Sequence, residues 1–395
     1  MAMLAACGSA GARSGPDVVL HWYAGPDRAD VQALASACTD KAGGQYSIEV
    51  EPLPDDQDRR RTVLLQRLLG DDTSMDLISL DDAFTAEFAD AQVLAPVPDE
   101  LAEKTVEEGF PTAVDAARYR GHLVAVPWWL DPVLLWYRPS AAERAGFSMD
   151  DRLTWDKLFD AAERINVQVP IDDGRGQGIA PLVNALIAQG GDDLVRGTGR
   201  DAQLGVDGPA GKKAAELLRA YHRKGLGEGP TDEAAEQFAA PSGGFMIAPV
   251  SAVSDPALAS IAGDIDWAPL PVSDQTDIAP VSGYHLAVPL YAPHSRESFE
   301  AIECLTSADV MADMMTRSGH SAASPAAYEK AGDDYPWADV TREAVDTGVA
   351  VPASPYWHLI HEAIGDTWLP LSEISASTPH DSQQRIEDLL AGDRP

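Results

Sequence analysis

The feature that most constrains the fold is a regular alternation of short β-rich and helical segments between residues 17 and 91. Strands rich in Val, Ile and Leu are predicted at 17–24 (DVVLHWYA), 46–53 (YSIEVEPL) and 75–81 (MDLISLD). A helical segment follows each of them, at 27–40, 59–70 and 83–91. This order, with short connections, predicts a parallel sheet covered by helices on both faces.

The rest of the chain predicts a second domain, since 395 residues exceed the size of a single hydrophobic core. Residues 119–138 are expected to form two strands joined by a bend at Asp131-Pro132. From about residue 140 to 280 the pattern is mainly helical, and residues 295–319 predict one long helix. Further strands are predicted at 245–250, 265–272 and 283–290.

The charge balance excludes one class of partner. The sequence holds 63 acidic and 29 basic residues, for a net charge of −34. A field of that sign repels the phosphate backbone of nucleic acids and anionic lipid headgroups, so we expect no nucleic-acid partner. The sequence also lacks an apolar run of the roughly 18 residues that a membrane span needs.

The N-terminus predicts a lipoprotein. Leu4-Ala5-Ala6-Cys7 followed by Gly8 matches a bacterial lipobox, and a Gly/Ser/Ala-rich tether follows it. We interpret residues 1–16 as the remnant of a signal peptide plus this tether, with Cys7 as the lipid anchor. The alternative is an Ala-rich N-terminus that arose by chance.

Two other cysteines, Cys38 and Cys304, lie in helix-like segments. They are either a disulfide, which we favour in an exported protein, or two buried thiols. A bridge would bring the late segment back to the first domain, which implies several crossings between two lobes. We therefore expect lobe 1 at 17–125 plus 282–324 and lobe 2 at 126–281 plus 325–395, with a ligand cleft between them.

An unusual aromatic stretch, VPWWLDPVLLWYRP (126–139), begins near the first crossing. Neighbouring side chains of a strand point to opposite faces, so only one of Trp128 and Trp129 can face a cleft. Asp131 shares a face with Trp129. A ring beside a carboxylate suits a sugar, whose C–H face stacks on the ring while its hydroxyls bind the acid. The alternative is that these rings only pack a domain boundary.

A pair of acids, Asp81 and Asp82, lies where the third predicted strand ends and a helix starts, at the edge where open α/β sheets bind ligands. We expect Asp81 to contact the ligand and Asp82 to be the helix cap or a solvated neighbour. Gly283 is expected to allow a ligand close to the backbone. Weaker candidates are Tyr23, Asn184, Tyr284, His285, Tyr356 and Trp357.

Motifs of enzymes and metal sites are largely missing. The sequence contains no G-x-S-x-G, no P-loop and no Cys-x-x-Cys, and the glycines of GRGQG (174–178) have the wrong spacing for a dinucleotide site. His358, His361 and Glu362 read H-x-x-H-E, which we interpret as a helix face at the surface. We expect no catalysis, no cofactor and no metal.

Four segments, in this order, resemble the extracellular solute-binding lipoproteins of bacterial sugar ABC importers. They are LDDAFTAEFADAQVLAPV, GHLVAVPWWLDPVLLWYRP, PLVNALIAQGGD and VSGYHLAVP. The resemblance covers most of residues 17–390 and is greatest to the trehalose-binding lipoproteins of mycobacteria, which suggests an actinobacterial source. It implies an α/β, two-lobed periplasmic-binding-protein (Venus-flytrap) fold with multiple crossovers between the lobes.

The resemblance also implies a function. The protein would be a monomer anchored outside the cell membrane only by its lipid. It would deliver a carbohydrate, such as trehalose or a maltose-like disaccharide, to an ABC permease and its ATPase subunits. It further implies the Cys38–Cys304 disulfide and sugar contacts at Asp81, Phe84, Asp131 and Gly283.

Two departures weaken the identification of the sugar. Val351 stands where the trehalose binders carry an arginine, and residues 245–250 (FMIAPV) lack the polar and aromatic residues of the corresponding strand. The sugar-binding class therefore carries over, whereas trehalose itself does not follow. Two alternatives to a sugar receptor are a receptor for a polyamine or peptide and, with less support, a secreted glycosidase that uses two of Asp81, Asp82 and Asp131.

Overall fold

The structure of the chain is a computed structural model that describes residues 18–25, 30–146, 153–173, 178–273 and 278–392. The predicted lipid anchor Cys7 and the tether lie outside the described residues. The strands are β1 (Val19–Ala24), β2 (Ser47–Pro52), β3 (Leu77–Asp81), β4 (Arg118–Tyr119), β5 (His122–Leu123), β6 (Val126–Tyr137), β7 (Ile171–Asp172), β8 (Val195–Arg196), β9 (Gln203–Leu204), β10 (Pro230–Thr231), β11 (Phe245–Pro249), β12 (Asp266–Ala268), β13 (Val281–Ala287) and β14 (Ser321–Ala322).

The α-helices are α1 (Val31–Lys41), α2 (Gln57–Leu69), α3 (Asp82–Asp90), α4 (Asp99–Glu108), α5 (Pro111–Ala116), α6 (Pro139–Ala145), α7 (Trp155–Ile165), α8 (Ala180–Gln189), α9 (Pro209–Arg223), α10 (Ala234–Ala239), α11 (Ser295–Leu305), α12 (Ala308–Ser318), α13 (Pro325–Ala331), α14 (Ala338–Thr347), α15 (Trp357–Trp368) and α16 (Thr378–Ala391). Short 3₁₀ helices are η1 (Val250–Ser254), η2 (Pro256–Asp264), η3 (Gly332–Asp334) and η4 (Leu371–Glu373). Within the described residues, no helix has the length and hydropathy of a membrane span.

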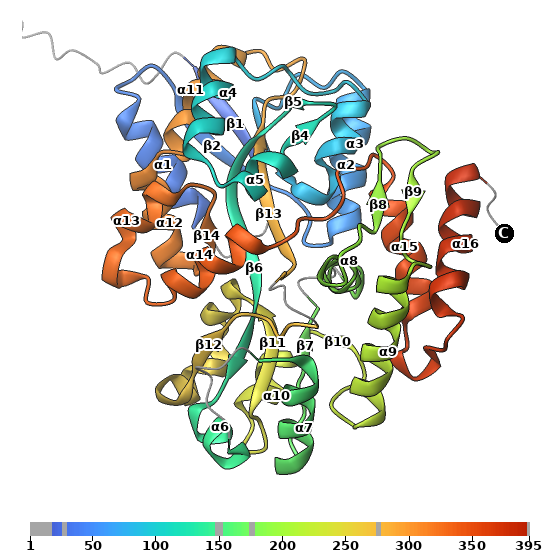
Figure 1. Cartoon of the computed structure of the whole chain (residues 1–395). Coiled ribbons are helices and arrows are strands. Elements are labelled where there is room, and N and C mark those ends of the chain that lie inside the picture. The colour runs from blue at the N-terminus through green and yellow to red at the C-terminus, as the bar shows by residue number, and fades with distance from the viewer. Residues whose placement is uncertain (1–17, 26–29, 147–152, 174–177, 274–277, 393–395) are drawn as a thin grey trace, which may run out of the picture.

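The fold is mixed α/β with two lobes, as the sequence predicts, and Figure 1 shows the lobes one above the other. Ten of the described strands form one sheet, whose main path is β10-β7-β11-β6-β13-β3-β1-β2. The predicted parallel part is present, because β1 pairs in parallel with both β2 and β3. The late strand β13 joins it antiparallel to β3.

One long strand, β6, connects the two lobes (Figure 1). Its first half, up to Pro132, pairs with β13, and its second half, from Val133, pairs with β11. We expected two strands with a bend at Asp131-Pro132, which is wrong. Pro132 has no N–H to donate, and it lies where the strand changes partner, so it does not interrupt either ladder.

The prediction of one long helix at 295–319 is also wrong. It is two helices, α11 and α12, separated at Thr306 and Ser307. Ser307 adopts an extended backbone, with φ −67° and ψ 145°, immediately before α12, and its hydroxyl donates to the Cys304 carbonyl at 2.6 Å. Serine is common at the residue immediately before a helix, and the extended backbone at Ser307 separates the end of α11 from the start of α12.

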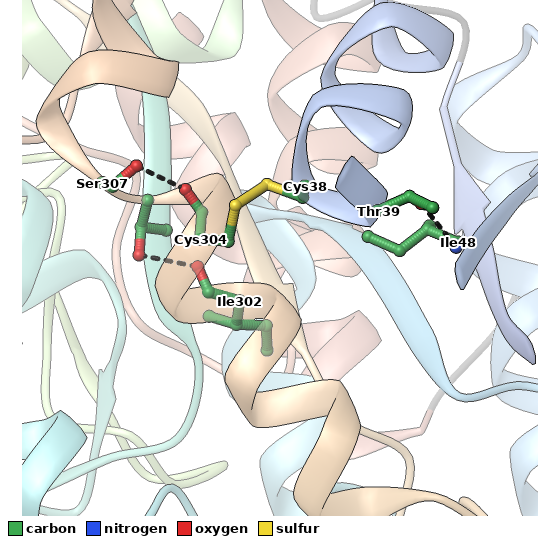
Figure 2. Close-up of a disulfide and its surroundings, with 7 residues drawn as sticks. Cys38, Thr39, Ile48, Ile302, Cys304 and Ser307 are labelled. Atoms are coloured by element: carbon green, nitrogen blue, oxygen red, sulfur yellow. Dashed lines mark hydrogen bonds between the residues drawn. A yellow bond between two sulfur atoms is a disulfide. The ribbon is translucent and has the colours of Figure 1, made fainter. Parts of the chain in front are cut away.

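A disulfide joins the early and late parts of the chain, as predicted. Cys38 of α1 is bonded to Cys304 of α11 across a sequence separation of 266 residues, and Figure 2 shows the two helices side by side at this bond. The Cys38 side chain lies in the same apolar cluster as Leu20, Trp22 and Ile302. The bridge therefore fixes α11 to the helix that follows β1.

The C-terminal segment differs from the expected division at residue 325. Helices α13 and α14 contact α12 and α5, and Tyr328, Tyr335 and Val345 belong to the same apolar cluster as Trp22. By contrast, α15 and α16 contact α8 and α9. Residues 325–347 thus pack with the β1–β2–β3 end of the sheet, and the chain leaves that end only after them.

Candidate ligand-binding site

A cavity, here called the main cleft, lies where β6 changes partners. Small-molecule sites commonly lie in such a position between two domains. The described residues that line it are Gln57, Arg60, Asp81, Trp129, Asp131, Val133, Ile171, Asp172, Asp173, Gly178, Pro181, Leu182, Ile247, Ala248, Pro249, Pro280, Ser282, Gly283 and Tyr284. They come from α2, β3, β6 and β13 on one side and from β7, α8 and β11 on the other.

Asp81 lines the main cleft, at the end of β3. Its carboxylate accepts a hydrogen bond from the Gln57 side chain at 2.8 Å and lies 4.0 Å from the Arg60 guanidinium. It also caps α3 by accepting from the backbone N–H of Ala83 at 3.2 Å. Burial raises the pKa of Asp81, while Arg60 acts to lower it.

Asp82 differs from its expected role, because Asp81 provides the cap and Asp82 is buried at 8 % exposure. It lines a smaller neighbouring cavity instead of the main cleft. Burial raises the pKa of Asp82 well above its usual range, and the negative charge of Asp81 raises it further. Ionisation of one of the two adjacent acids therefore disfavours ionisation of the other.

The two tryptophans divide between core and cleft, as strand geometry requires. Trp128 is fully buried and packs edge-on against Trp22, with ring centroids 5.3 Å apart. Trp129 lines the main cleft but is only 1 % exposed. Its indole stacks on Tyr284 at 4.7 Å and on His320 at 3.9 Å. Trp129 thus supports the Tyr284 ring, which also lines the cleft.

Asp131 lines the main cleft and also joins the crossing strand β6 to the segment that follows β11. Its carboxylate accepts from the Ser251 backbone N–H at 2.9 Å and from the Ser251 hydroxyl at 2.6 Å. The ring nitrogen Nδ1 of His320 lies 3.6 Å from the same carboxylate. These contacts tie the middle of β6 to η1, the 3₁₀ helix that follows β11.

Gly283 lines the main cleft and is also packed tightly against β6. A Cβ at this position would lie 2.4 Å from the Trp129 carbonyl oxygen and 3.0 Å from the Leu130 side chain. The missing side chain therefore makes room for the neighbouring strand β6, and close approach of a ligand at this position stays a prediction.

Several predicted site residues lie away from the main cleft. Tyr23 stacks under Arg67, Tyr356 packs against Arg200, and the Asn184 side chain donates to the Ala350 carbonyl at 3.1 Å. His285 is fully buried beside the Thr85 hydroxyl, and burial lowers its pKa to about 3. Phe84 and Trp357 line the neighbouring cavity with Asp82.

Sequence reasoning missed Gln57, Arg60, Asp172 and Asp173, which all line the main cleft. Gln57 and Arg60 lie three residues apart, on one face of the first turn of α2 after the cap residue Asp56. That spacing was a usable signal. His358 and His361 line the neighbouring cavity, so the H-x-x-H-E face is not simply surface.

The side chains of the main cleft are suited to binding a small molecule. It combines one aromatic ring pair, aliphatic side chains and hydrogen-bonding groups from Asp, Gln and Ser. Among the described lining residues, four carboxylates face a single cation, Arg60. No group of three or more His, Cys, Asp or Glu side chains suited to a metal ion occurs in the described residues.

Comparison with known proteins supports the family-level expectation. The profile of a family described as "Bacterial extracellular solute-binding protein" matches residues 25–312. A "Probable ABC transporter-binding protein" of Deinococcus radiodurans is 23% identical over 292 residues, which cover 69% of this chain and 68% of that protein.

Solved structures with the same fold share little sequence with this chain. The maltose-bound MalE3 of T. maritima has a TM-score of 0.80 and 20% identity, over 95% of this chain and 99% of that one. The sugar-binding protein MalE of Xanthomonas citri has a TM-score of 0.82 and 20% identity, over 95% and 98%. At this identity the likeness establishes the fold and leaves the ligand open.

Proposed function

Since this chain belongs to the family of bacterial extracellular solute-binding proteins, we propose that it captures a carbohydrate in the main cleft for an ABC importer. The observation that carries the proposal is the position of the Tyr284 ring among carboxylates at the crossing strand. Tyr284 of β13 pairs with Trp129 of β6 on one side and with Asp81 of β3 on the other. An aromatic ring with adjacent acids matches the C–H and O–H surfaces of a sugar.

Neutral sugar chemistry fits the charges of the cleft. Asp81 and Asp131 already accept hydrogen bonds from protein groups, and each carboxylate has further lone pairs for sugar hydroxyls. A phosphorylated or acidic sugar would meet the four carboxylates of the described lining and is disfavoured. A disaccharide of the maltose or trehalose class is the proposed cargo.

Capture requires the two lobes to close on the ligand. The cleft is lined from both ends of the sheet, so a ligand held by β3 and β13 on one side also meets β7 and β11 on the other. Closure then follows from higher affinity for the sugar in the closed form. The proposed partners are an ABC permease with its ATPase subunits, and Cys7 is the proposed lipid anchor.

The proposal is tested by a thermal-shift screen of the protein against sugars. The panel contains glucose, galactose, trehalose, maltose, sucrose, cellobiose and maltotriose. A ligand at a hundredfold excess over its dissociation constant adds about 2.7 kcal/mol of stability, which raises Tm measurably. A shift with at least one sugar is expected, and no shift with any of them would contradict the proposal.

The excess of carboxylates favours one second candidate, a receptor for a cationic solute such as a polyamine. Four acids against one arginine in the described lining would attract an extended cation. Adding spermidine to the same screen separates the two candidates. A shift from spermidine without any sugar shift would assign the cleft to a cation.

A further inference from the structure

His320 is a fully buried histidine that lies beside two residues of the main cleft and is not itself among the described residues that line it. It stands between α12 and the short strand β14, which pairs antiparallel with β6. Ser321 is paired with Leu130, so the preceding residue, His320, lies next to Asp131 in this register. Because side chains alternate between the faces of a sheet, His320 shares a face with Asp131 and Trp129.

Three flat rings stack on this face, in the order His320, Trp129, Tyr284. The ring centroids of His320 and Trp129 are 3.9 Å apart with an interplanar angle of 14°, and those of Trp129 and Tyr284 are 4.7 Å apart with an angle of 24°. Strand β6 pairs with β14 at one edge and with β13 at the other, so the Trp129 ring lies between the other two. His320 therefore forms the buried end of the stack, and Tyr284 forms the end that lines the cleft.

The turn that carries His320 is fixed by contacts of its own backbone. The His320 N–H donates to the Ser318 hydroxyl at 3.2 Å, and the Gly319 carbonyl accepts from the Tyr335 hydroxyl at 3.1 Å. Gly319 has a φ of 80°, and a Cβ at this position would lie 2.3 Å from the Val253 side chain. The imidazole ring thus stands on a restrained backbone inside a closely packed region.

The direction of the Tyr284 ring depends on the rings behind it. The ladder between β13 and β6 is irregular between Tyr284 and His285, and such irregularities re-aim the side chains next to them. Stacking on Trp129 then fixes the plane of the Tyr284 ring, and His320 in turn fixes the plane of the Trp129 ring. His320 also lies beside an acid of the cleft, with Nδ1 3.6 Å from the Asp131 carboxylate.

We propose that His320 is a positioning residue for ligand binding, because its imidazole ring supports Trp129 and thereby sets the orientation of the Tyr284 ring that a sugar contacts. The inference rests on the proposed function and adds to it a residue that itself contacts no ligand. A histidine that only filled the core would contribute to the free energy of unfolding and leave the affinity of the folded protein unchanged. A positioning histidine changes that affinity, and another flat ring at the same position restores it.

The test is isothermal titration of the most stabilising sugar of the thermal-shift panel into the protein and into three variants of His320. Circular dichroism establishes that each variant is folded at the titration temperature. His320→Leu and His320→Gln remove the flat ring and leave an apolar and a polar side chain, and each is expected to weaken binding at least fivefold. His320→Phe keeps a flat ring against Trp129 and is expected to bind within twofold of the unmodified protein.

Phe159→Leu is the matched control. It removes a buried ring of α7 that packs with Trp155 and Tyr221, each at a centroid distance of 5.8 Å, and none of these three residues lines the main cleft. The variant is expected to be less stable than the unmodified protein, while its sugar affinity changes less than twofold.

The possible results separate the two proposals. Unchanged affinity in a folded ring-free variant, or an equal loss in all three His320 variants, overturns the positioning role and leaves the proposed function standing. Failure of both ring-free variants to fold assigns His320 to the core alone and likewise overturns that role. If no sugar of the panel binds the unmodified protein, the proposed function is overturned together with this inference.

Discussion

Asp131 occupies a position at which one side chain serves two purposes. It lines the main cleft, and it receives two hydrogen bonds from Ser251 at 2.9 and 2.6 Å while being 1 % exposed. The sequence suggested only the first purpose, because the second depends on a residue 120 positions away. Weaker ligand binding by an Asp131 variant could therefore result from the loss of a ligand contact or from the loss of the structural contact with Ser251.

A double-mutant cycle separates these contributions in the unliganded protein. Ser251→Ala removes the hydroxyl that donates to Asp131, and Asp131→Asn removes the charge that accepts it. The expected coupling energy in urea unfolding is about 1.5–3 kcal/mol, as for hydrogen bonds to charged groups. The control cycle pairs Ser251→Ala with Asp388→Asn, at an exposed site of α16, and is expected to be additive. A coupling near zero in the first cycle would show that this contact is not structural.

His285 makes a pH-dependent contribution that can be measured. Its folded-state pKa, lowered to about 3 by burial, lies below the value of 6.5 for an unperturbed histidine. Between these pH values the unfolded chain binds a proton that the folded protein does not. Stability from this group is therefore complete above pH 6.5 and is lost as pH falls, by about 1.4 kcal/mol per pH unit.

The measurement compares urea unfolding of the protein and of His285→Asn from pH 4 to 6.5. The unmodified protein is expected to lose about 1.4 kcal/mol more per pH unit than the variant. The raised pKa values of Asp81 and Asp82 act in the opposite sense, since their stabilising contribution is lost as pH rises. Both proteins keep these acids, so the difference in slope reports His285. Equal slopes would contradict the assignment of His285 as a buried neutral histidine.

At the scale of elements, the register between β6 and β13 fixes the cleft. Tyr284 pairs with Trp129, and Ser282 pairs with Asp131, so the two strands together carry most of the cleft's ring and acid groups. The ladder is irregular between Tyr284 and His285, which indicates a β-bulge next to the site. The close packing at Gly283 is what allows the two strands to hold this register.

Two glycine substitutions test this packing. Gly283→Ala places a Cβ 2.4 Å from the Trp129 carbonyl oxygen and is expected to destabilise the protein by about 1–3 kcal/mol. Gly365→Ala, in the middle of α15 with no atom within 4 Å of its Cβ, is expected to stabilise it by up to about 1 kcal/mol. Urea unfolding of both variants gives the comparison, and effects of the same sign would contradict the packing described here.

Local sequence patterns predicted where strands and helices lie better than they predicted which strands pair. The β1, β2 and β3 strands follow from alternating or continuous apolar runs, and Asp81 follows from its place at the end of β3. The continuity of β6 could not be predicted, because Pro132 reads as a strand breaker until β11 is known to take over its pairing. The role of Gly283 was hidden for the same reason, since its neighbour in space is 154 positions earlier in sequence.

At the scale of the whole molecule, the long crossing strand and the return of β13 bring the two ends of the sheet against one cavity. The disulfide between α1 and α11 and the packing of α13 and α14 keep distant parts of the chain in one lobe. Sequence reasoning found the two-lobed fold and five of the residues that line the main cleft: Asp81, Trp129, Asp131, Gly283 and Tyr284. The smaller neighbouring cavity was not predicted, because its lining joins α2, α3, α8 and α15, whose packing is not encoded locally.

The most direct test of the central claim is isothermal titration of the most stabilising sugar into the protein and into Asp81→Asn. We predict one site per chain, with an affinity that falls at least tenfold in Asp81→Asn and less than twofold in the control Asp388→Asn. Undiminished binding to Asp81→Asn, or no binding of any sugar to the unmodified protein, would contradict the claim that the main cleft is a carbohydrate site.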